Sequence, residues 1–348
     1  MKIFLTFLLV LIVSTNDMFS CTDVRLNNSG EYQITGRTMD FAMELGTSVV
    51  IVPRGINFIS YSDKQERGIS WTNKYAFVGT NALGQLHFTD GLNECGLSCA
   101  TLWLTDSKFS DIDVKGENFI AIIDIVSWAL GNFQNVDEVQ IALRQIPVIA
   151  YFNESTKMDF PLHLSVHDKN GNDLVVEWLE GKAVFYNNQA KVLTNHPIFS
   201  WHLLNLENYS NLTNKNVKDA TFKTLPNGTG MRGLPADAMP SSRFIRAYFK
   251  NKYSPTPKNT KEAIGLMANI MNNVLVNKGE VDEGDYTQWI VIRDHKELVY
   301  YFRDYDNTSL RAVDLKSFDF NKYKIVKYIP ITEGKWYQNL DNELREIK

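Results

Sequence analysis

A cysteine stands where a signal peptide would end, and that position gives it chemistry that an internal cysteine lacks. Lys2 precedes a short apolar run, and a polar stretch then leads to Ser20. A charged start, a short apolar centre and a small residue before the junction are typical of a cleaved secretory signal. We therefore expect residues 1–20 to be a signal peptide and Cys21 to begin a single mature domain over residues 21–348.

A cysteine at the start of a chain carries both a nucleophile and a base. The reference pKa of an α-amine is about 7.7–8.0 and that of a thiol is about 8.5, so a proton passes readily between the two groups near neutral pH. The thiol attacks a carbonyl while the amine of the same residue takes up and returns the proton, as in N-terminal nucleophile enzymes. Cleavage after Ser20 would therefore equip Cys21 for hydrolysis.

A different class of protein also begins with a cysteine after a signal peptide. In a bacterial lipoprotein the cysteine is acylated, so it lacks a free base, and the protein would act as a binding module without catalysis. Met18-Phe19-Ser20 fits this processing route poorly, because the route favours a leucine-like residue and small residues before the cysteine. The free or acylated state of the Cys21 amine separates the two interpretations.

Arg37 and Asp40 lie three residues apart in the segment 36–41. One interpretation is a solvated ion pair on the surface. The other is catalytic, because a cation near a thiolate lowers the thiol pKa. A carboxylate near the terminal amine would then fix its orientation, as the third group of a catalytic triad does. The spacing alone leaves both interpretations open.

Several segments, taken in order along the chain, resemble the choloylglycine hydrolase and penicillin V acylase family. The resemblance begins with Cys21-Thr22 at the expected start of the mature chain. It continues with Gly-Arg-Thr-Met-Asp-Phe at 36–41, Asp-Gly-Leu-Asn-Glu-Cys-Gly-Leu at 90–97, Pro-Leu-His at 161–163, Thr-Asn-His-Pro at 194–197, Ser-Arg-Phe-Ile-Arg at 242–246 and Tyr-Phe-Arg-Asp-Tyr-Asp-Asn at 301–307. Each segment is short, but their joint order over nearly the whole mature chain is specific.

The resemblance implies a fold and a reaction. The fold class is α+β, a four-layer αββα sandwich of two antiparallel sheets between helical layers. The reaction is hydrolysis of a linear, non-peptide amide without organic cofactor or metal. Cys21 would be nucleophile and base, Asp40 would bind its amine, and Arg37 and Arg243 would support the charge on sulfur. Asn195 would donate its side-chain amide to the oxyanion.

The resemblance also places an acyl-binding pocket at Met39, Phe41 and Trp103. The position of Trp103 supplies a backbone N–H to the oxyanion in the family, and typical bile-salt hydrolases have Asn there. An apolar, aromatic pocket favours aryl- or fatty-acyl amides, as in a penicillin V acylase. The alternative is a conjugated bile-salt hydrolase. The segment 206–240, rich in Asn, Gly and Thr, is the expected substrate lid.

These residues need a scaffold that brings distant segments together. Alternating and β-rich runs predict strands, and helical periods predict helices. The expected strands are 48–52, 75–80, 97–104, 162–166, 174–178, 183–186, 289–292 and 298–302, and the expected helices are 118–131, 136–145, 242–250 and 260–276. Thr260 is the expected N-cap of the last helix. Because strands come in runs and helices in pairs, the pattern favours antiparallel sheets with helices packed outside.

Composition narrows the partners and the compartment. Hydrophobic residues make up 44% and charged residues 22%, which is typical of a folded domain. The formal net charge of −4 gives no polybasic surface, so we expect no nucleic-acid partner. No later stretch is long enough to span a bilayer. We therefore expect a secreted or periplasmic protein whose partner is a small-molecule amide. Members of the family it resembles are often homotetramers, and the sequence shows no interface.

The remaining cysteines and the histidines do not predict a metal site. Cys95 and Cys99 lie too far apart along an expected strand for an easy disulfide, so we expect both to be buried apolar side chains. The histidines show no H-E-x-x-H or other ligand spacing, and His196 is expected in a turn. No G-x-S-x-G supports a Ser–His–Asp hydrolase.

Overall fold

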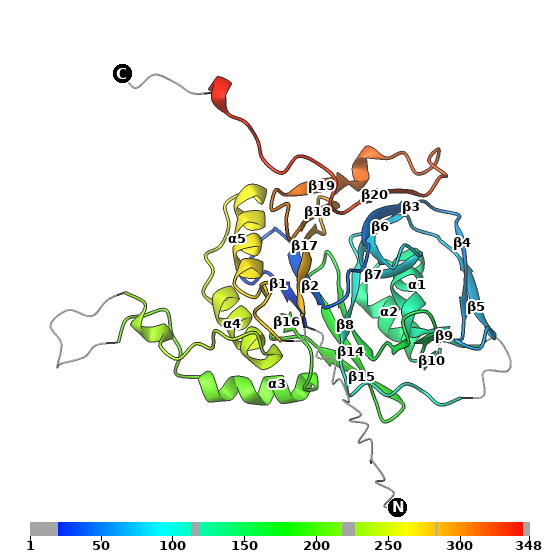
Figure 1. Cartoon of the computed structure of the whole chain (residues 1–348), viewed down its shortest axis with the longest axis horizontal. Helices are drawn as coiled ribbons and strands as arrows, with labels where there is room; N and C mark the ends of the chain where they lie inside the picture. Colours follow the sequence, from blue (N-terminus) through cyan, green and yellow to red (C-terminus); the bar gives the residue numbers. More distant parts are fainter. Residues whose placement is uncertain (1–19, 113–117, 218–226, 283, 344–348) are drawn as a thin grey trace, which may run out of the picture.

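Two antiparallel sheets lie face to face at the centre of the molecule, with helices on the outer side of each (Figure 1). The structure, a computed structural model, describes residues 20–112, 118–217, 227–282 and 284–343. Apart from Ser20, the expected signal peptide lies outside these residues. The arrangement is an α+β, four-layer αββα sandwich, so the fold predicted from the sequence is confirmed.

The first sheet carries the candidate nucleophile and has six strands. Its order is β16 (Val192–Leu193), β1 (Cys21–Arg25), β2 (Ile34–Phe41), β17 (Tyr286–Asp294), β18 (Val299–Asp304) and β19 (Arg311–Asp314). In the antiparallel pair of β1 and β2, Cys21 lies opposite Met39 and Asp23 lies opposite Arg37. β17 pairs with the other edge of β2, so segments from both ends of the chain become neighbours.

The second sheet has eight strands and forms the opposite wall of the sandwich. Its order is β15 (Lys182–Asn187), β14 (Asp173–Leu179), β13 (Leu162–His167), β8 (Ser98–Trp103), β7 (His87–Asn93), β6 (Phe77–Ala82), β3 (Ser48–Val52) and β20 (Lys327–Pro330). β7 and β8 stand near its middle, so this sheet supplies His87, Asp90, Thr101 and Trp103 to the region between the sheets.

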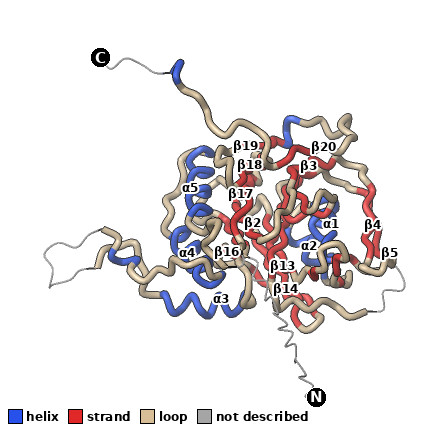
Figure 2. The backbone as a smooth tube through the Cα atoms, in the orientation of Figure 1, coloured by secondary structure: helices blue, strands red, loops and turns tan. Residues whose placement is uncertain are grey.

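Five α-helices of the described chain form the two outer layers (Figure 2). On the side of the eight-stranded sheet lie α1 (Ile125–Asn132), which packs against β7 and β8, and α2 (Val136–Leu143). On the other side lie α3 (Phe199–Leu206), α4 (Pro240–Lys252), which packs against β1, and α5 (Thr260–Asn272), which packs against β2. Gly36 permits that last contact, because a Cβ there would lie 2.7 Å from Met267 of α5.

Three small two-stranded sheets extend this framework. They are β4 (Asn57–Tyr61) with β5 (Arg67–Thr72), β9 (Ile120–Ala121) with β10 (Val148–Ile149), and β11 (Phe152–Asn153) with β12 (Met158–Asp159). The β9–β10 pair is parallel and the other two pairs are antiparallel. These additions pack around the eight-stranded sheet and supply Tyr151 and Asn153 to the pocket described below.

The expected elements are found within a few residues of their positions, with three corrections. The helix predicted from residue 118 begins at Ile125, because β9 and a short 3₁₀ turn occupy 120–124. Asn259, not Thr260, caps α5, since its side chain accepts the Glu262 N–H. Cys95 is half-buried in the turn after β7, so its prediction as a buried side chain was wrong. Cys99 is buried as predicted.

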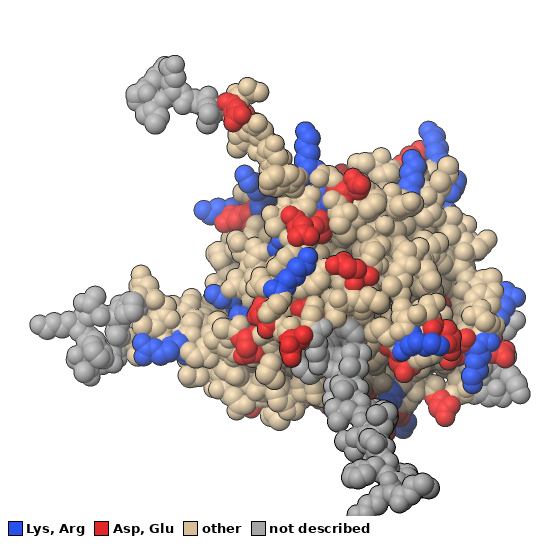
Figure 3. Space-filling model, viewed as in Figure 1, with Lys and Arg blue, Asp and Glu red and all other residues tan. Residues whose placement is uncertain are grey.

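The described chain has no membrane-spanning helix, and the face drawn in Figure 3 has no charged stripe. No helix there is both long and apolar enough to cross a bilayer. On the face drawn in Figure 3, acidic and basic side chains are interspersed over the body of the molecule. This face therefore provides no large field of one sign to attract a polyanion.

Candidate active site

Cys21 opens β1 at the edge of the space between the two sheets. The residue is 3% exposed, and its Sγ lies 3.8 Å from Sδ of Met39, the residue opposite it in the strand pair. Its backbone nitrogen, which in the full chain follows Ser20, donates a hydrogen bond to Oδ1 of Asn195 at 2.6 Å. The pairing of β1 with β2 thus places both the thiol and the nitrogen of Cys21 beside groups from distant segments.

Arg37 faces the sulfur from β2 and is held from the opposite sheet. Its Nη2 lies 3.7 Å from the Cys21 Sγ and donates to the Thr101 carbonyl, while Nη1 donates to the Thr89 carbonyl and lies 3.4 Å from the Asp90 carboxylate. The side chain has no exposed surface. The surface ion pair with Asp40 is therefore excluded, and Arg37 is a fixed cation beside the thiol.

The thiol is nevertheless held in its neutral form in the full chain. Burial raises the pKa of Cys21 above its ordinary value, and the positive charge of Arg37 offsets this only in part. An ammonium group at the same residue would add a second positive charge close to the sulfur. Arg37 alone therefore does not produce a thiolate at this site. Its catalytic role requires the second positive charge of a Cys21 ammonium group.

Asp40 lies on the other face of β2, because successive side chains of a strand point to opposite sides. Its carboxylate accepts a hydrogen bond from the Thr287 hydroxyl at 2.6 Å and lies 3.7 Å from Nη1 of Arg243. A bulge in β17 interrupts the register between Thr287 and Trp289, directly opposite this part of β2. Burial raises the pKa of Asp40 to about 6, although Arg243 and Thr287 favour the carboxylate.

Arg243 and Asn195 enclose the backbone of Cys21. Arg243, in the first turn of α4, donates from Nη1 to the Cys21 carbonyl at 2.7 Å and from Nη2 to Oδ1 of Asn195 at 2.8 Å. Nδ2 of Asn195 donates to the Trp103 carbonyl at 2.9 Å. Arg243 therefore contacts the backbone of Cys21 and not its sulfur. Asn195 links Cys21, α4 and β8 through one side chain.

Two buried histidines fix the segment that carries Asn195. His202 in α3 donates from Nε2 to the Asn195 carbonyl at 2.9 Å, and its ring stacks on Phe244 at 4.8 Å between centroids. His163 in β13 donates to the Thr194 carbonyl at 2.9 Å. Burial lowers the pKa of His202 to about 4, so it is a neutral donor near pH 7. No local sequence pattern predicts either role, because neither histidine stands next to Asn195 in the chain.

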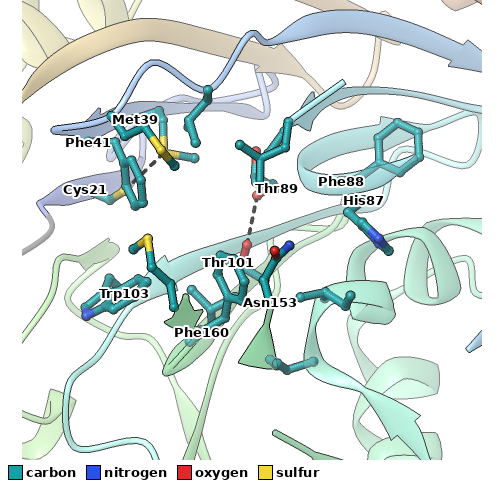
Figure 4. A pocket seen from close by; sticks show the side chains of 18 of the residues that line it. Cys21, Met39, Phe41, His87, Phe88, Thr89, Thr101, Trp103, Asn153 and Phe160 are labelled. Atoms are coloured by element: carbon teal, nitrogen blue, oxygen red, sulfur yellow. Dashed lines mark hydrogen bonds between the residues drawn. The ribbon is translucent and has the colours of Figure 1, made fainter. Parts of the chain in front are cut away.

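A pocket opens directly from the sulfur (Figure 4). It holds about 840 Å³ of empty space, its open mouth included, and Cys21, Arg37 and Asp40 lie in its wall. The predicted acyl-binding residues Met39, Phe41 and Trp103 all line it. Trp103 packs edge-on against Phe41 and Phe160, with ring centroids 6.3 and 6.4 Å apart respectively. The aromatic wall predicted from the sequence therefore lies beside the candidate nucleophile.

The lining also includes side chains that the sequence did not single out. They come from β7, from the 3₁₀ turn at 122–124 and from the β11–β12 hairpin, and they include His87, Phe88, Ile122, Ile123, Tyr151, Asn153, Met158 and Phe160. No described residue of the expected lid segment 206–240 is among the lining residues, and 218–226 lie outside the described chain. His196 pairs with Asp106 at 2.6 Å and is half-exposed outside the pocket.

Known proteins with similar sequences identify the family of this chain. A family model described as linear amide C–N hydrolases, choloylglycine hydrolase family, matches residues 21–328. The chain belongs to this family. A bile salt hydrolase/transferase from Clostridium perfringens is 32% identical over 324 residues, which cover 88% of this chain and 97% of that protein. A penicillin V acylase from Pectobacterium atrosepticum is 28% identical over 316 residues, which cover 83% of this chain and 79% of that protein.

Solved structures of family members have the same architecture. A variant of conjugated bile acid hydrolase from Clostridium perfringens matches with a TM-score of 0.79 and 28% identity, covering 90% of this chain and 99% of the other. A penicillin V acylase from Agrobacterium tumefaciens matches with a TM-score of 0.75 and 27% identity, covering 89% and 91%. The chain is thus an amidohydrolase of the linear-amide type, as the resemblance of its segments implied.

Next to the candidate active site of this choloylglycine hydrolase family member lies a buried network of alternating positive and negative side chains. Both ring nitrogens of His167 contact carboxylates at 2.6 Å, those of Asp23 and Asp173. Arg293 joins Asp23 at 2.5 Å and Asp90 at 3.3 Å, and Asp90 in turn faces Arg37. Burial alone would lower the pKa of His167, but Asp23 and Asp173 raise it above its ordinary value.

This network should make the folded protein less stable as pH rises. Because the pKa of His167 is raised in the folded state, its contribution is fully present below the unfolded value of about 6.5 and is lost as pH rises through the folded pKa. We expect His167→Gln to lower the free energy of unfolding by about 3–5 kcal/mol near pH 6, since it breaks a buried ion pair. Urea midpoints of both proteins between pH 6 and 9 measure the effect, and a difference that stays constant across this range would contradict it.

Proposed function

We propose that the mature protein is an exported N-terminal cysteine amidohydrolase that acts on linear amides with an aryl or flexible alkyl acyl group. The observation that carries the proposal is the apolar, aromatic pocket that opens at the Cys21 sulfur. The family match begins at residue 21, which supports Cys21 as the first residue of the mature chain. No cluster of His, Cys, Asp or Glu in the described residues is arranged to hold a metal ion, and this mechanism uses none.

In the proposed first step, the Cys21 thiol transfers its proton to its own free amine and attacks the amide carbon. Arg37, 3.7 Å from Sγ, stabilises the developing thiolate. The negative charge that forms on the carbonyl oxygen would be met by the Asn195 amide and the Trp103 backbone N–H. The C–N bond then breaks, and the Cys21 ammonium gives its proton to the leaving amine. The acyl group remains as a thioester on sulfur.

In the second step, water replaces the amine. The free Cys21 amine takes a proton from a water molecule, which attacks the thioester carbon and releases the carboxylic acid and the thiol. Asp40 would hold the amine through both steps, with Arg243 and Thr287 fixing the carboxylate. Met39, Phe41 and Trp103 would bind the acyl group and would have no proton to transfer.

The shape of the pocket near the sulfur favours a slender acyl group. Trp103 packs against both Phe41 and Phe160, and all three rings line the pocket that opens at Cys21. Flat aryl groups and alkyl chains bind such walls through area and edge-to-face contacts. A rigid steroid needs a wider passage. A second candidate, conjugated bile-salt hydrolysis, is favoured by the 32% identity with the bile salt hydrolase/transferase from Clostridium perfringens.

Rates on three substrate classes decide between these candidates. We expect kcat/KM for phenoxyacetyl or fatty-acyl amides to exceed that for glycocholate and taurocholate by about tenfold or more, which corresponds to about 1.4 kcal/mol of transition-state binding. Trp103→Asn should move the ratio towards bile salts, because it removes the indole that narrows the pocket. Bile salts preferred tenfold by the unaltered enzyme would reverse the assignment of substrate class. An unchanged ratio in the variant would place selectivity elsewhere.

Export and processing are tested by intact mass. The proposal requires a secreted or periplasmic protein whose mass corresponds to residues 21–348 with a free amine. A mass increased by acyl groups would instead indicate the lipoprotein, which lacks the base. Light scattering of the same sample would test the homotetramer that is common in the family.

A further inference from the structure

The pocket that opens at Cys21 has a polar group at its far end. In Figure 4, Cys21 lies at one side with Met39 and Phe41, and His87 lies at the opposite side next to Phe88. Most of the pocket wall is apolar, although Thr89, Thr101 and Asn153 lie between Cys21 and His87 (Figure 4). The proposed chemistry at the Cys21 sulfur does not need an imidazole at the far end of the pocket. The presence of His87 in the pocket wall therefore requires another explanation.

The orientation of His87 is fixed by a buried carboxylate. Nδ1 lies 3.2 Å from Oδ1 of Asp124, whose other oxygen accepts a hydrogen bond from the Ser60 hydroxyl at 2.7 Å. Ser60 itself accepts the Ala121 N–H at 2.9 Å. Asp124 is 8% exposed. His87 in β7 and Ser60 in β4 thus hold the carboxylate. Because a carboxylate oxygen accepts hydrogen bonds, this contact keeps the proton of a neutral imidazole on Nδ1.

The other nitrogen of His87 is left for a ligand. With Nδ1 protonated, Nε2 presents a lone pair, and within the described chain the imidazole has no hydrogen-bond partner besides Asp124. The His87 side chain is 35% exposed, so the nitrogen is reachable. The Tyr151 ring lies 6.4 Å from that of His87 and also lines the pocket, and its hydroxyl has no hydrogen bond to the described residues.

A hydroxyl group on the ligand matches these two side chains. It donates its hydrogen to the Nε2 lone pair and accepts one from the Tyr151 hydroxyl. A methyl end would leave both groups without partners once water is displaced, and a site built to bind a hydroxyl discriminates against the analogue that lacks it. A carboxylate would lack the hydrogen that a neutral imidazole accepts.

We propose that His87 and Tyr151 form a hydroxyl-binding subsite at the far end of the acyl pocket, which selects amides whose acyl chain carries a hydroxyl remote from the scissile bond. This inference deepens the proposed function and rests on it for the position of the scissile amide at Cys21. Asp124 acts through His87 by fixing its tautomer and is a positioning residue.

The test compares matched substrates on the mature protein. Straight-chain acyl p-nitroanilides of increasing length are prepared with and without a terminal hydroxyl, and the ratio of their kcat/KM values is measured at each length. We expect the ratio to favour the hydroxylated member at one chain length. Tyr151→Phe, which removes a single oxygen, and His87→Phe should each lower that ratio about tenfold, or about 1.4 kcal/mol. His87→Gln, which keeps a hydrogen-bonding group, should restore part of it.

The measured quantity in each variant is the kcat/KM of the hydroxylated amide divided by that of the amide without the hydroxyl. A general loss of activity lowers both values equally and leaves this ratio unchanged. Wild-type ratios in both phenylalanine variants at every chain length would overturn the proposal. Preference for a terminal carboxylate over the hydroxyl would overturn it as well.

A binding arm separates this inference from the proposed function. Calorimetry with mature Cys21→Ala measures the affinity for fatty acids with and without the terminal hydroxyl, and needs no turnover. Tighter binding of the hydroxylated acid, lost in Tyr151→Phe, supports the subsite even if none of the amides is hydrolysed, in which case the proposed function fails alone. Equal binding of the two acids at all chain lengths contradicts the subsite whatever the rates.

Discussion

A mature chain that begins at Cys21 should hydrolyse its amide substrate, whereas the same chain with Ser20 retained should be inactive. The retained residue turns the Cys21 amine into an amide, so the thiol loses its base and the ammonium charge beside it. Burial already raises the thiol pKa, and Arg37 does not overcome that effect. Removing the base of a nucleophile–base pair can cost as much as removing the nucleophile, on the order of 10⁶ in kcat, and we expect a loss of that size.

Single-turnover assays on the two chains, with Cys21→Ala as the reference for zero activity, measure this effect. Cys21→Ser in the mature chain should also be severely impaired, because a hydroxyl is hardly ionised near neutral pH. Both substitutions are small, and near-UV circular dichroism checks that each protein is folded. Substantial activity in the Ser20-extended chain would show that the free amine of Cys21 is not the required base. Substantial activity in Cys21→Ala would show that another residue performs the attack.

The segments that the sequence assigned correctly are those with a clear polar and apolar alternation or a clear helical period. The strand at Ser48–Val52 was predicted with its observed bounds, and the hairpin of β13 and β14 was predicted to within one residue at each end. β1 and β2 were not predicted as strands, although β1 carries the candidate nucleophile Cys21 and β2 carries Arg37 and Asp40. Both are buried on both faces and contain charged residues, so they show neither an alternating nor an apolar pattern.

The candidate site residues were identified from the sequence by other means than secondary-structure patterns. Cys21 was identified from its position after a signal-like segment, and the other candidate catalytic residues came from the resemblance to a family. The structure brings Cys21, Arg37, Asp40, Asn195 and Arg243 together. Asp90, His163 and His202 hold Arg37 and the segment around Asn195 in place. Their contacts could not be read from the sequence, because each contact joins separate parts of the fold.

The ion-pair partners of Arg37 and Asp40 could not be deduced from the spacing of these two residues either. Arg37 and Asp40 are three residues apart, so in an extended strand they point to opposite faces. Arg37 meets Asp90 of the other sheet, and Asp40 meets Arg243 of α4. The surface-pair interpretation required a helix or an exposed loop. The strand geometry therefore decides between the two interpretations, and it does so in favour of two separate buried pairs.

Asn195→Ala should reduce kcat by on the order of 10²–10³, the usual cost of removing one oxyanion donor. The side chain has two ends with different tasks. Its Oδ1 accepts hydrogen bonds from the Cys21 nitrogen and from Arg243, and its Nδ2 donates to the Trp103 carbonyl. In the proposed mechanism Nδ2 also donates to the oxyanion, and alanine removes both ends at once.

Asn195→Asp separates the two tasks. The carboxylate keeps acceptors for the Cys21 amine and for Arg243 but has no hydrogen to donate, and its negative charge opposes the developing oxyanion. We therefore expect Asn195→Asp to be at least as impaired in kcat as Asn195→Ala, with KM changed little in either variant. An aspartate variant that recovers most of the activity would assign Asn195 to holding the amine and remove it from the oxyanion hole. An alanine variant within tenfold of the wild type would exclude both roles.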